Sequence, residues 1–378
     1  MDIGKIIRFL LVAGCFAGAI AYIASVSHKR DVSRQLQSFQ NEQAMQKARK
    51  EKEQAHREEA ITDDARVDRP LFPWRDENGK MGFIDKEGNV VIPCQWNDAL
   101  SFSKSLAAIR DRNGKWGFID KEGNVMIPCQ WDEVRQFSEG LAAVKDNNKG
   151  WGFIRPTGEM PFTYSDRLVP KDGFMYFQED YAVVLDCNTG KYGFVNKGRK
   201  FLQDSWWYDA YPFSEGLAAV KDENGKWGFI NRSGNLEIPC LWDKANSFSE
   251  GLAAVEHDDK WGFIDKKGDV VIPCDWDLVY SGFSEGLVQV YDCLNGSGFI
   301  DKKGNVVIPC QWDSADDFSE GLAAVQDRSY KWGFIDKQGN VVIPCQWDEV
   351  CQFSAGLVQV WNYDGRIHYI DKTGRIIK

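Results

Sequence analysis

This sequence of 378 residues has few histidines, no net basic charge and no clustered metal ligands. The four histidines, His28, His56, His257 and His368, are scattered and lack the spacing of a zinc site or of a Ser–His–Asp triad. The formal net charge of -10 argues against a nucleic-acid partner, because phosphate binding needs a basic surface. We therefore expect no catalytic residues, no cofactor, no bound metal ion and no nucleic-acid partner.

Long apolar runs are also rare, and the one present lies at residues 6–26, interrupted only by Arg8. As a helix it would span about 31 Å, which matches a hydrocarbon core of about 30 Å. This predicts an N-terminal membrane anchor or signal-anchor in residues 1–27. The stretch that ends at Cys15 (V-A-G-C) offers an alternative, because it looks like a bacterial lipoprotein processing box that would lipidate Cys15. A cleaved signal peptide is less consistent with the long apolar run, which lacks a small-x-small exit.

Residues 28–68 form a charged segment between this run and the rest of the chain. Within it, residues 34–66 are rich in Gln, Glu, Lys, Arg and Ala and contain no Gly or Pro, which favours a solvated helical stalk or linker. Lys and Arg counts beside the apolar run slightly favour a cytoplasmic C-terminal part, whereas single N-terminal anchors in bacteria more often export the domain attached to them. We expect a single-pass membrane protein whose remaining residues are periplasmic or extracellular.

A repeat fills residues 69–378. Glycines that come after Trp or an equivalent residue recur about every 35 residues, with one insertion, at Gly82, Gly117, Gly152, Gly193, Gly228, Gly262, Gly298 and Gly333. A ninth, shortened copy occupies residues 366–378. Such a period indicates that each copy is one small structural unit that packs against its neighbours.

Each unit predicts three strands. An L-A-A-V strand and a K-W-G-F-I strand are joined by a Gly-containing turn, and a D-K-x-G turn leads to an N-V-V-I-P strand that proline ends. We expect an all-β tandem-repeat array of three-stranded units, preceded by a transmembrane helix and a helical stalk. A propeller-like ring is favoured because the two ends of the array are in phase. An open β-solenoid is the alternative, because nine blades exceed the usual four to eight.

The recurring K-W-G-F-I-D-K-x-G-N-V-V-I-P, followed by F-S-E-G-L-A-A-V, closely resembles the bacterial WG-repeat (KWG-repeat) proteins. The resemblance covers residues 71–378. It implies an all-β array, proposed to be propeller-like, with no general enzymatic activity. Units three and four, at about residues 152–225, depart from the pattern, because residues 155–167 and 196–211 replace the I-P-C-Q-W-D segment.

Cysteines, tryptophans and aspartates recur with the repeat. The cysteines after I-P are Cys94, Cys129, Cys240, Cys274, Cys310 and Cys345. No C-x-x-C spacing exists, so we interpret these residues as small apolar packing groups, with inter-unit disulfides as the alternative. The two tryptophans of each unit predict packing between units. The aspartates of the D-K-x-G turns predict backbone hydrogen bonds within the turn, with a calcium ladder as the alternative.

Aromatic residues that the repeat does not explain gather where it breaks down. Aromatic clusters of this kind are candidate binding sites. The candidate partner-binding residues are Tyr164, Tyr176, Trp206, Trp207, Tyr208 and Tyr211. We expect a membrane-tethered, non-enzymatic module that binds a protein partner at the bacterial envelope. Glycan or cell-wall binding through exposed aromatics is the alternative.

Overall fold

The computed structural model describes residues 69–163, 168–171, 176–202, 206–363 and 367–378. Residues Pro70–Lys378 form one compact unit. The predicted membrane span, Cys15 and the predicted stalk all lie outside the described residues. Within the described residues, no helix is long and apolar enough to cross a membrane.

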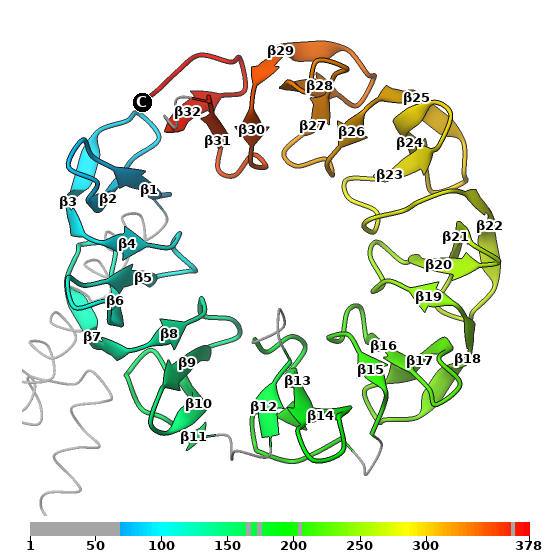
Figure 1. Cartoon of the computed structure of the whole chain (residues 1–378), viewed down its shortest axis with the longest axis horizontal. Helices are drawn as coiled ribbons and strands as arrows, with labels where there is room; N and C mark the ends of the chain where they lie inside the picture. Colours follow the sequence, from blue (N-terminus) through cyan, green and yellow to red (C-terminus); the bar gives the residue numbers. More distant parts are fainter. Residues whose placement is uncertain (1–68, 164–167, 172–175, 203–205, 364–366) are drawn as a thin grey trace, which may run out of the picture. The chain divides into compact units, whose positions relative to one another are not determined.

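Residues 70–378 fold into nine small antiparallel sheets, one for each predicted unit (Figure 1). The first three are β1 (Phe72–Arg75), β2 (Met81–Ile84) and β3 (Val90–Trp96); β4 (Asp98–Ala99), β5 (Ala107–Arg110), β6 (Trp116–Ile119) and β7 (Val125–Trp131); and β8 (Glu133–Val134), β9 (Ala142–Asp146), β10 (Gly150–Ile154) and β11 (Phe162–Thr163). The next three are β12 (Leu168–Pro170), β13 (Tyr181–Asp186) and β14 (Lys191–Asn196); β15 (Asp209–Ala210), β16 (Leu217–Lys221), β17 (Trp227–Asn231) and β18 (Leu236–Trp242); and β19 (Lys244–Ala245), β20 (Ala253–His257), β21 (Lys260–Ile264) and β22 (Val270–Trp276). The last three are β23 (Leu287–Asp292), β24 (Gly296–Asp301) and β25 (Val306–Trp312); β26 (Ser314–Ala315), β27 (Leu322–Gln326), β28 (Trp332–Asp336) and β29 (Val341–Trp347); and β30 (Glu349–Val350), β31 (Leu357–Trp361) and β32 (Ile367–Asp371).

The predicted three strands are present, and most sheets also have a short strand that the sequence did not reveal. In the second sheet this strand, β4, pairs with β5 through Asp98↔Arg110 and Ala99↔Ile109. It belongs to the connector, the segment that leads from the last strand of one sheet to the first long strand of the next. The connectors that carry F-S-E-G turn toward the interior of the ring, whereas β7, β18, β22 and β29 lie on its outside (Figure 1). Because these outer strands form the last strand of their sheets, their prolines block pairing with another chain.

The glycine of the W-G pair is fixed by close approach of two backbones. A Cβ at Gly262 would lie 2.5 Å from the Ile272 carbonyl oxygen and 2.7 Å from the Cys274 nitrogen. Both atoms belong to β22, whose register with β21 shifts at this point, as in a β-bulge. The signature glycine therefore allows the third strand to bulge across the second.

The D-K-x-G turns are closed by hydrogen bonds from backbone N–H groups to the aspartate, as the sequence predicted. In the turn at Asp301, its carboxylate accepts hydrogen bonds from the backbone N–H groups of Lys303 (2.8 Å) and Asn305 (2.9 Å). Gly304 has φ +83°, a value that a residue with a side chain rarely adopts. The same aspartate-to-amide bonds recur in the turns at Asp85, Asp120, Asp265, Asp336 and Asp371.

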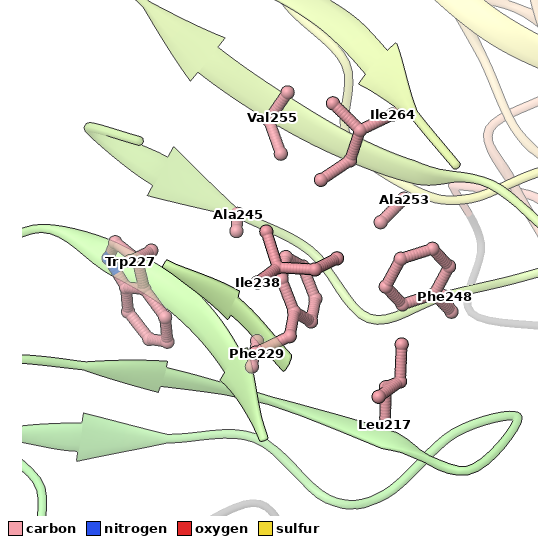
Figure 2. Close-up of a cluster of buried hydrophobic side chains, with 10 residues drawn as sticks. Leu217, Trp227, Phe229, Ile238, Ala245, Phe248, Ala253, Val255 and Ile264 are labelled. Atoms are coloured by element: carbon pink, nitrogen blue, oxygen red, sulfur yellow. The ribbon is translucent and has the colours of Figure 1, made fainter. Parts of the chain in front are cut away.

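The core lies between neighbouring sheets rather than within one. In Figure 2, Phe229, Ile238 and Phe248 point toward one another, and Phe248 comes from the connector to the next sheet. The two phenyl rings meet edge to face at 4.9 Å. Removing such a buried Phe costs about 3–5 kcal/mol. Most of the tryptophans pack in these clusters, as do four of the six repeat cysteines, Cys129, Cys274, Cys310 and Cys345. All six repeat cysteines are free and half-buried. The packing interpretation of both residue types is confirmed.

The array closes on itself. Phe72 and Ile84 of the first sheet share a buried cluster with Leu357 and Tyr369 of the last. The Tyr369 hydroxyl donates a hydrogen bond of 2.8 Å to the Pro73 carbonyl oxygen. These contacts make the array propeller-like and exclude an open solenoid.

Candidate functional site

Two of the predicted binding residues, Trp206 and Trp207, pack against the fourth sheet. The backbones of Tyr192 and Trp207 form a bridge, with both N–H···O distances at 2.8 Å. This is the pairing that joins the two tryptophans in other sheets, such as Trp227↔Trp242. Trp207 therefore occupies a repeat position, and reading it as outside the repeat was wrong because the insertion hides the alignment.

Trp206 takes the place of the third strand, which the fourth sheet does not have among the described residues. A Cβ added at Gly193 would lie 2.9 Å from the nearest atom of the Trp206 ring. In other sheets, such as at Gly262, the nearest atoms belong to the backbone of the third strand. Phe201 packs on the same ring with centroids 5.6 Å apart. The side chain thus covers the W-G glycine in place of the bulged strand, which gives it a packing role.

Tyr211 belongs to a cluster that holds a lysine. The Lys171 ammonium lies 4.9 Å from the Tyr192 ring centroid and 4.8 Å from that of Tyr211, and its side chain is only 12% exposed. It also forms an ion pair with Asp209 at 2.5 Å. Tyr211 stacks on Trp227 at 5.0 Å, and burial raises the pKa of the Tyr211 hydroxyl, with a smaller contribution from Asp209.

Tyr208 is the one predicted residue that is clearly exposed among those described, at 50%. The Lys191 ammonium lies 4.7 Å from its ring. Tyr176 is half-buried, and burial raises the pKa of its hydroxyl. Tyr164 lies outside the described residues. The predicted cluster is therefore mostly packing, with Tyr208 on its surface.

The connectors inside the ring are tied together by a repeated set of contacts. Ser284 donates a hydrogen bond of 2.8 Å to the carbonyl oxygen of Phe318 in the next connector. Glu285 accepts a hydrogen bond from the Gly321 amide of that connector. The Lys337 ammonium, from a turn further along the chain, forms an ion pair of 3.1 Å with Glu285.

These contacts set the charge of the glutamates. In Glu250 and Glu320, burial favours the neutral acid, but the lysine ammonium and the backbone N–H donors outweigh it. They hold the pKa of both carboxyls below the usual value. The F-S-E-G residues are thus engaged in structure and are not free to bind a ligand.

Two residues directly before the connector phenylalanine differ from unit to unit, and we call them the variable pairs. They are Leu100–Ser101, Arg135–Gln136, Tyr211–Pro212, Asn246–Ser247, Ser281–Gly282, Asp316–Asp317 and Cys351–Gln352. Apart from the buried Pro212, they are half-buried or exposed. Our sequence reasoning missed them because it concentrated on the residues that recur. Aligning the units on F-S-E-G and asking which adjacent positions vary would have revealed them.

Neighbouring variable pairs contact each other. The Gln136 amide donates a hydrogen bond of 3.1 Å to the Ser101 carbonyl oxygen, and the Ser281 hydroxyl lies 2.5 Å from an Asp317 carboxylate oxygen. Burial, and for Asp316 also its neighbour Asp317, raises the pKa of both aspartates. The pairs therefore form a joined surface whose chemistry changes around the ring.

Acidic groups come together elsewhere without forming a built metal site. Asp243, His257 and Asp258 form one cluster, and Asp277, Asp292 and Cys293 form another. Asp243 is bound to Lys226 and Asp277 to Lys260, at 2.5 and 2.6 Å. Asp243 and Asp277 are thus each paired with a lysine.

Comparisons with known proteins agree with this architecture. A structure described as a eukaryotic initiation factor is 14% identical over 82% of this chain and 95% of its own, with a TM-score of 0.60. A computationally designed protein, Ika8, is 14% identical over 72% and 95%, with a TM-score of 0.45. BamB from Moraxella catarrhalis is 10% identical over 65% and 86%, with a TM-score of 0.44. At 14% identity the first similarity shows a shared fold and nothing more. The other two have TM-scores below 0.5, and no conclusion is based on them. No curated protein matches the chain.

The repeat itself gives a more specific result. The pattern of the WG containing repeat matches residues 81–116, 116–149, 192–227, 227–261, 261–291, 298–329 and 332–360. These stretches cover more than half of the chain and leave out the degenerate third unit. The chain therefore belongs to the family of proteins built from WG-containing repeats.

Proposed function

We propose that this protein is a membrane-tethered, non-enzymatic module that binds a protein partner at the bacterial envelope through the variable pairs inside the ring. The tether is the apolar run at residues 6–26. The ring presents the binding surface, and its repeated residues serve as the scaffold.

The observation that carries this proposal is the contrast between constant and variable residues in the connectors. Ser249, Glu250 and Gly251 are held by bonds to neighbouring connectors or to a lysine. The pair before the connector phenylalanine ranges from Arg135–Gln136 to Asp316–Asp317 on the same backbone frame. A rigid scaffold that carries differing side chains on loops is the usual arrangement of a binding surface.

The same geometry makes glycan binding and catalysis less favoured. Glycan stacking needs open tryptophan faces, yet every tryptophan in the described residues is buried or half-buried. Catalysis by a His-activated nucleophile needs a hydroxyl or thiol at the imidazole. Of the two histidines in the described ranges, His257 lies beside Asp243 and Asp258, and His368 lies against Trp347.

The proposal is tested by partner capture with two sets of variants of the full chain. Arg135→Glu combined with Asp316→Lys changes the variable pairs while leaving net charge the same. Lys303→Glu combined with Asp275→Lys is the matched control on exposed positions away from the connectors. We expect the first set to reduce capture of a cross-linked partner at least tenfold and the control to leave it unchanged. Equal capture by both sets would contradict the assignment of the surface.

The tether and the compartment need a separate measurement. A topology reporter fused after Lys378 is expected to be active on the outer side of the membrane, as the sequence predicts. Activity on the cytoplasmic side would reverse the orientation. Release of the chain by salt or carbonate washing would contradict the tether.

A further inference from the structure

The seam is the junction where the last sheet meets the first, and it is built differently from the other junctions among the described residues. The other junctions hold a phenylalanine from the connector against the phenylalanine of the preceding W-G-F strand, with centroids 4.8 to 5.0 Å apart. At the seam the described residues provide no connector. Tyr369 takes the W-G-F position and packs on Phe72 at 5.5 Å.

The first sheet consequently has a free edge. In the second sheet, β5 pairs with the short connector strand β4. The corresponding strand of the first sheet, β1, pairs only with β2 among the described residues. An extended segment could therefore add to β1 by main-chain hydrogen bonds, as in β-strand addition.

Two cavities lie at the seam, between residues of the first two sheets and of the last. One of about 540 Å³ lies along Trp74, Arg75, Gln359 and His368. The other, of about 280 Å³, is lined by Phe102, Lys104, Lys121, Ser354 and Tyr369. Both also include Pro73 and Gln359, so they adjoin each other.

The seam also has lysines that lack the acid that the repeat provides elsewhere. In five units the lysine after the first turn residue (Asp, or Asn196 in the fourth unit) pairs with the glutamate of the connector that enters the preceding sheet, at 2.8 to 3.1 Å: Lys197–Glu139, Lys266–Glu215, Lys302–Glu250, Lys337–Glu285 and Lys372–Glu320. Lys121 holds the same position, but the corresponding connector would enter the first sheet, and the described residues do not provide it.

Two further substitutions add positive charge or remove negative charge at the same place. Lys104 replaces the F-S-E-G glutamate in the first connector, and Ala355 replaces it in the last. No ion pair of Lys104 or Lys121 occurs within the described part of the chain. The smaller cavity is thus lined by two lysines and by no acidic residue among those described, whereas Asp76 and Glu77 line the larger one.

From these observations we infer that the seam binds an extended peptide segment of a partner protein that carries an aromatic residue followed within a few positions by a carboxylate. The aromatic ring enters the cavity beside Phe102 and Tyr369, the main chain pairs with β1, and the carboxylate binds Lys121. This inference rests on the proposed role in protein binding but uses a surface separate from the variable pairs.

The test uses the full chain in detergent and a fluorescent peptide with the sequence of residues 311–321 (QWDSADDFSEG), which copies a connector of the ring itself. Fluorescence anisotropy should show saturable binding. Lys121→Glu should weaken binding at least tenfold, whereas Lys303→Glu, an equal charge change on an exposed turn lysine, should not. Peptides carrying Phe318→Ala or Glu320→Lys should also lose binding to the unchanged protein. The Glu320→Lys peptide should regain binding to the Lys121→Glu protein.

A benzophenone amino acid at position 121 identifies what occupies the seam. Cross-linking to the peptide supports the inference. Cross-linking to residues 1–68 of the same chain, or to a second copy, would overturn it, as would no peptide binding at about 1 mM. If the peptide fails while the variable-pair variants still lose partner capture, the seam inference fails and the proposed function stands. Because Lys121 forms no ion pair with any residue that the structure describes, its variant should keep the wild-type unfolding midpoint.

Discussion

Replacing Gly333 by alanine tests whether the W-G glycine is required by backbone contact. Its Cβ would lie 2.5 Å from the Ile343 carbonyl oxygen, 2.7 Å from the Cys345 nitrogen and 2.8 Å from the Pro344 carbonyl carbon. All three are backbone atoms of β29, so no side chain can rotate away and the strand itself must move. Overpacking costs about 1–3 kcal/mol, and each weakened hydrogen bond about 1 kcal/mol more. We expect a loss of about 2–4 kcal/mol.

The matched control is Gly193→Ala, at the same position of the fourth unit. There the three atoms nearest to the Cβ all belong to the side chain of Trp206, which can shift. In the ninth unit, where the described residues provide no third strand, His368 occupies the position of the glycine. The control should therefore cost less than half as much.

Urea unfolding followed by tryptophan fluorescence measures the total loss, and hydrogen exchange of β28 and β29 locates it. The local measurement is needed because a repeat array need not unfold in one step. A loss below about 0.5 kcal/mol for Gly333→Ala would refute the reasoning, since the contacts leave no room for a methyl group. Equal losses at Gly333 and Gly193 would refute it as well.

Three further predictions concern single groups. Ser284→Ala removes the hydrogen bond to the next connector and should cost about 1 kcal/mol, seen as faster hydrogen exchange in that connector; unchanged exchange would contradict this. The Cys293 amide and the Lys260 ammonium lower the pKa of Asp277 to about 2, so its stabilising effect is present above about pH 4 and is lost as the pH falls toward 2. Carboxyl NMR should give a midpoint below 3, and Asp277→Asn should flatten acid unfolding in this range. Burial and a nearby aspartate raise the pKa of Cys345 to about 11, so its alkylation at pH 8 should be at least tenfold slower than that of a free cysteine peptide, as measured by mass spectrometry.

Local chemistry explains what the sequence could predict. The turn at Asp301 is defined by bonds within four residues, and the strand pattern of each unit repeats often enough to be read reliably. These features depend on neighbours along the chain. The strands, the turns and the packing role of the tryptophans and cysteines were predicted for this reason.

What could not be predicted depends on contacts between distant residues. The bond from Tyr369 to Pro73 joins residues 296 positions apart and closes the array. The lysine–glutamate pairs join residues from different units, and nothing in one unit indicates which glutamate is bound. Trp207 was misread because the insertion before it shifts the alignment, although its backbone restores the register. The in-phase ends of the array favoured a ring, and an alignment on F-S-E-G would have found the variable pairs, but the residues that close the ring and the arrangement of lysines at the seam required the structure.

The lysine–glutamate pairs have a consequence for how the array loses its structure. Lys337 belongs to the eighth sheet and reaches Glu285, which lies in the turn that opens the seventh sheet. In a linear Ising description each such pair strengthens the nearest-neighbour term between adjoining units. A unit that opens in the middle of the array therefore breaks these ion pairs as well as its apolar contacts. Fraying should begin at the seam, where the described residues provide no such pair for Lys121 and the ring is held by Tyr369 and Phe72.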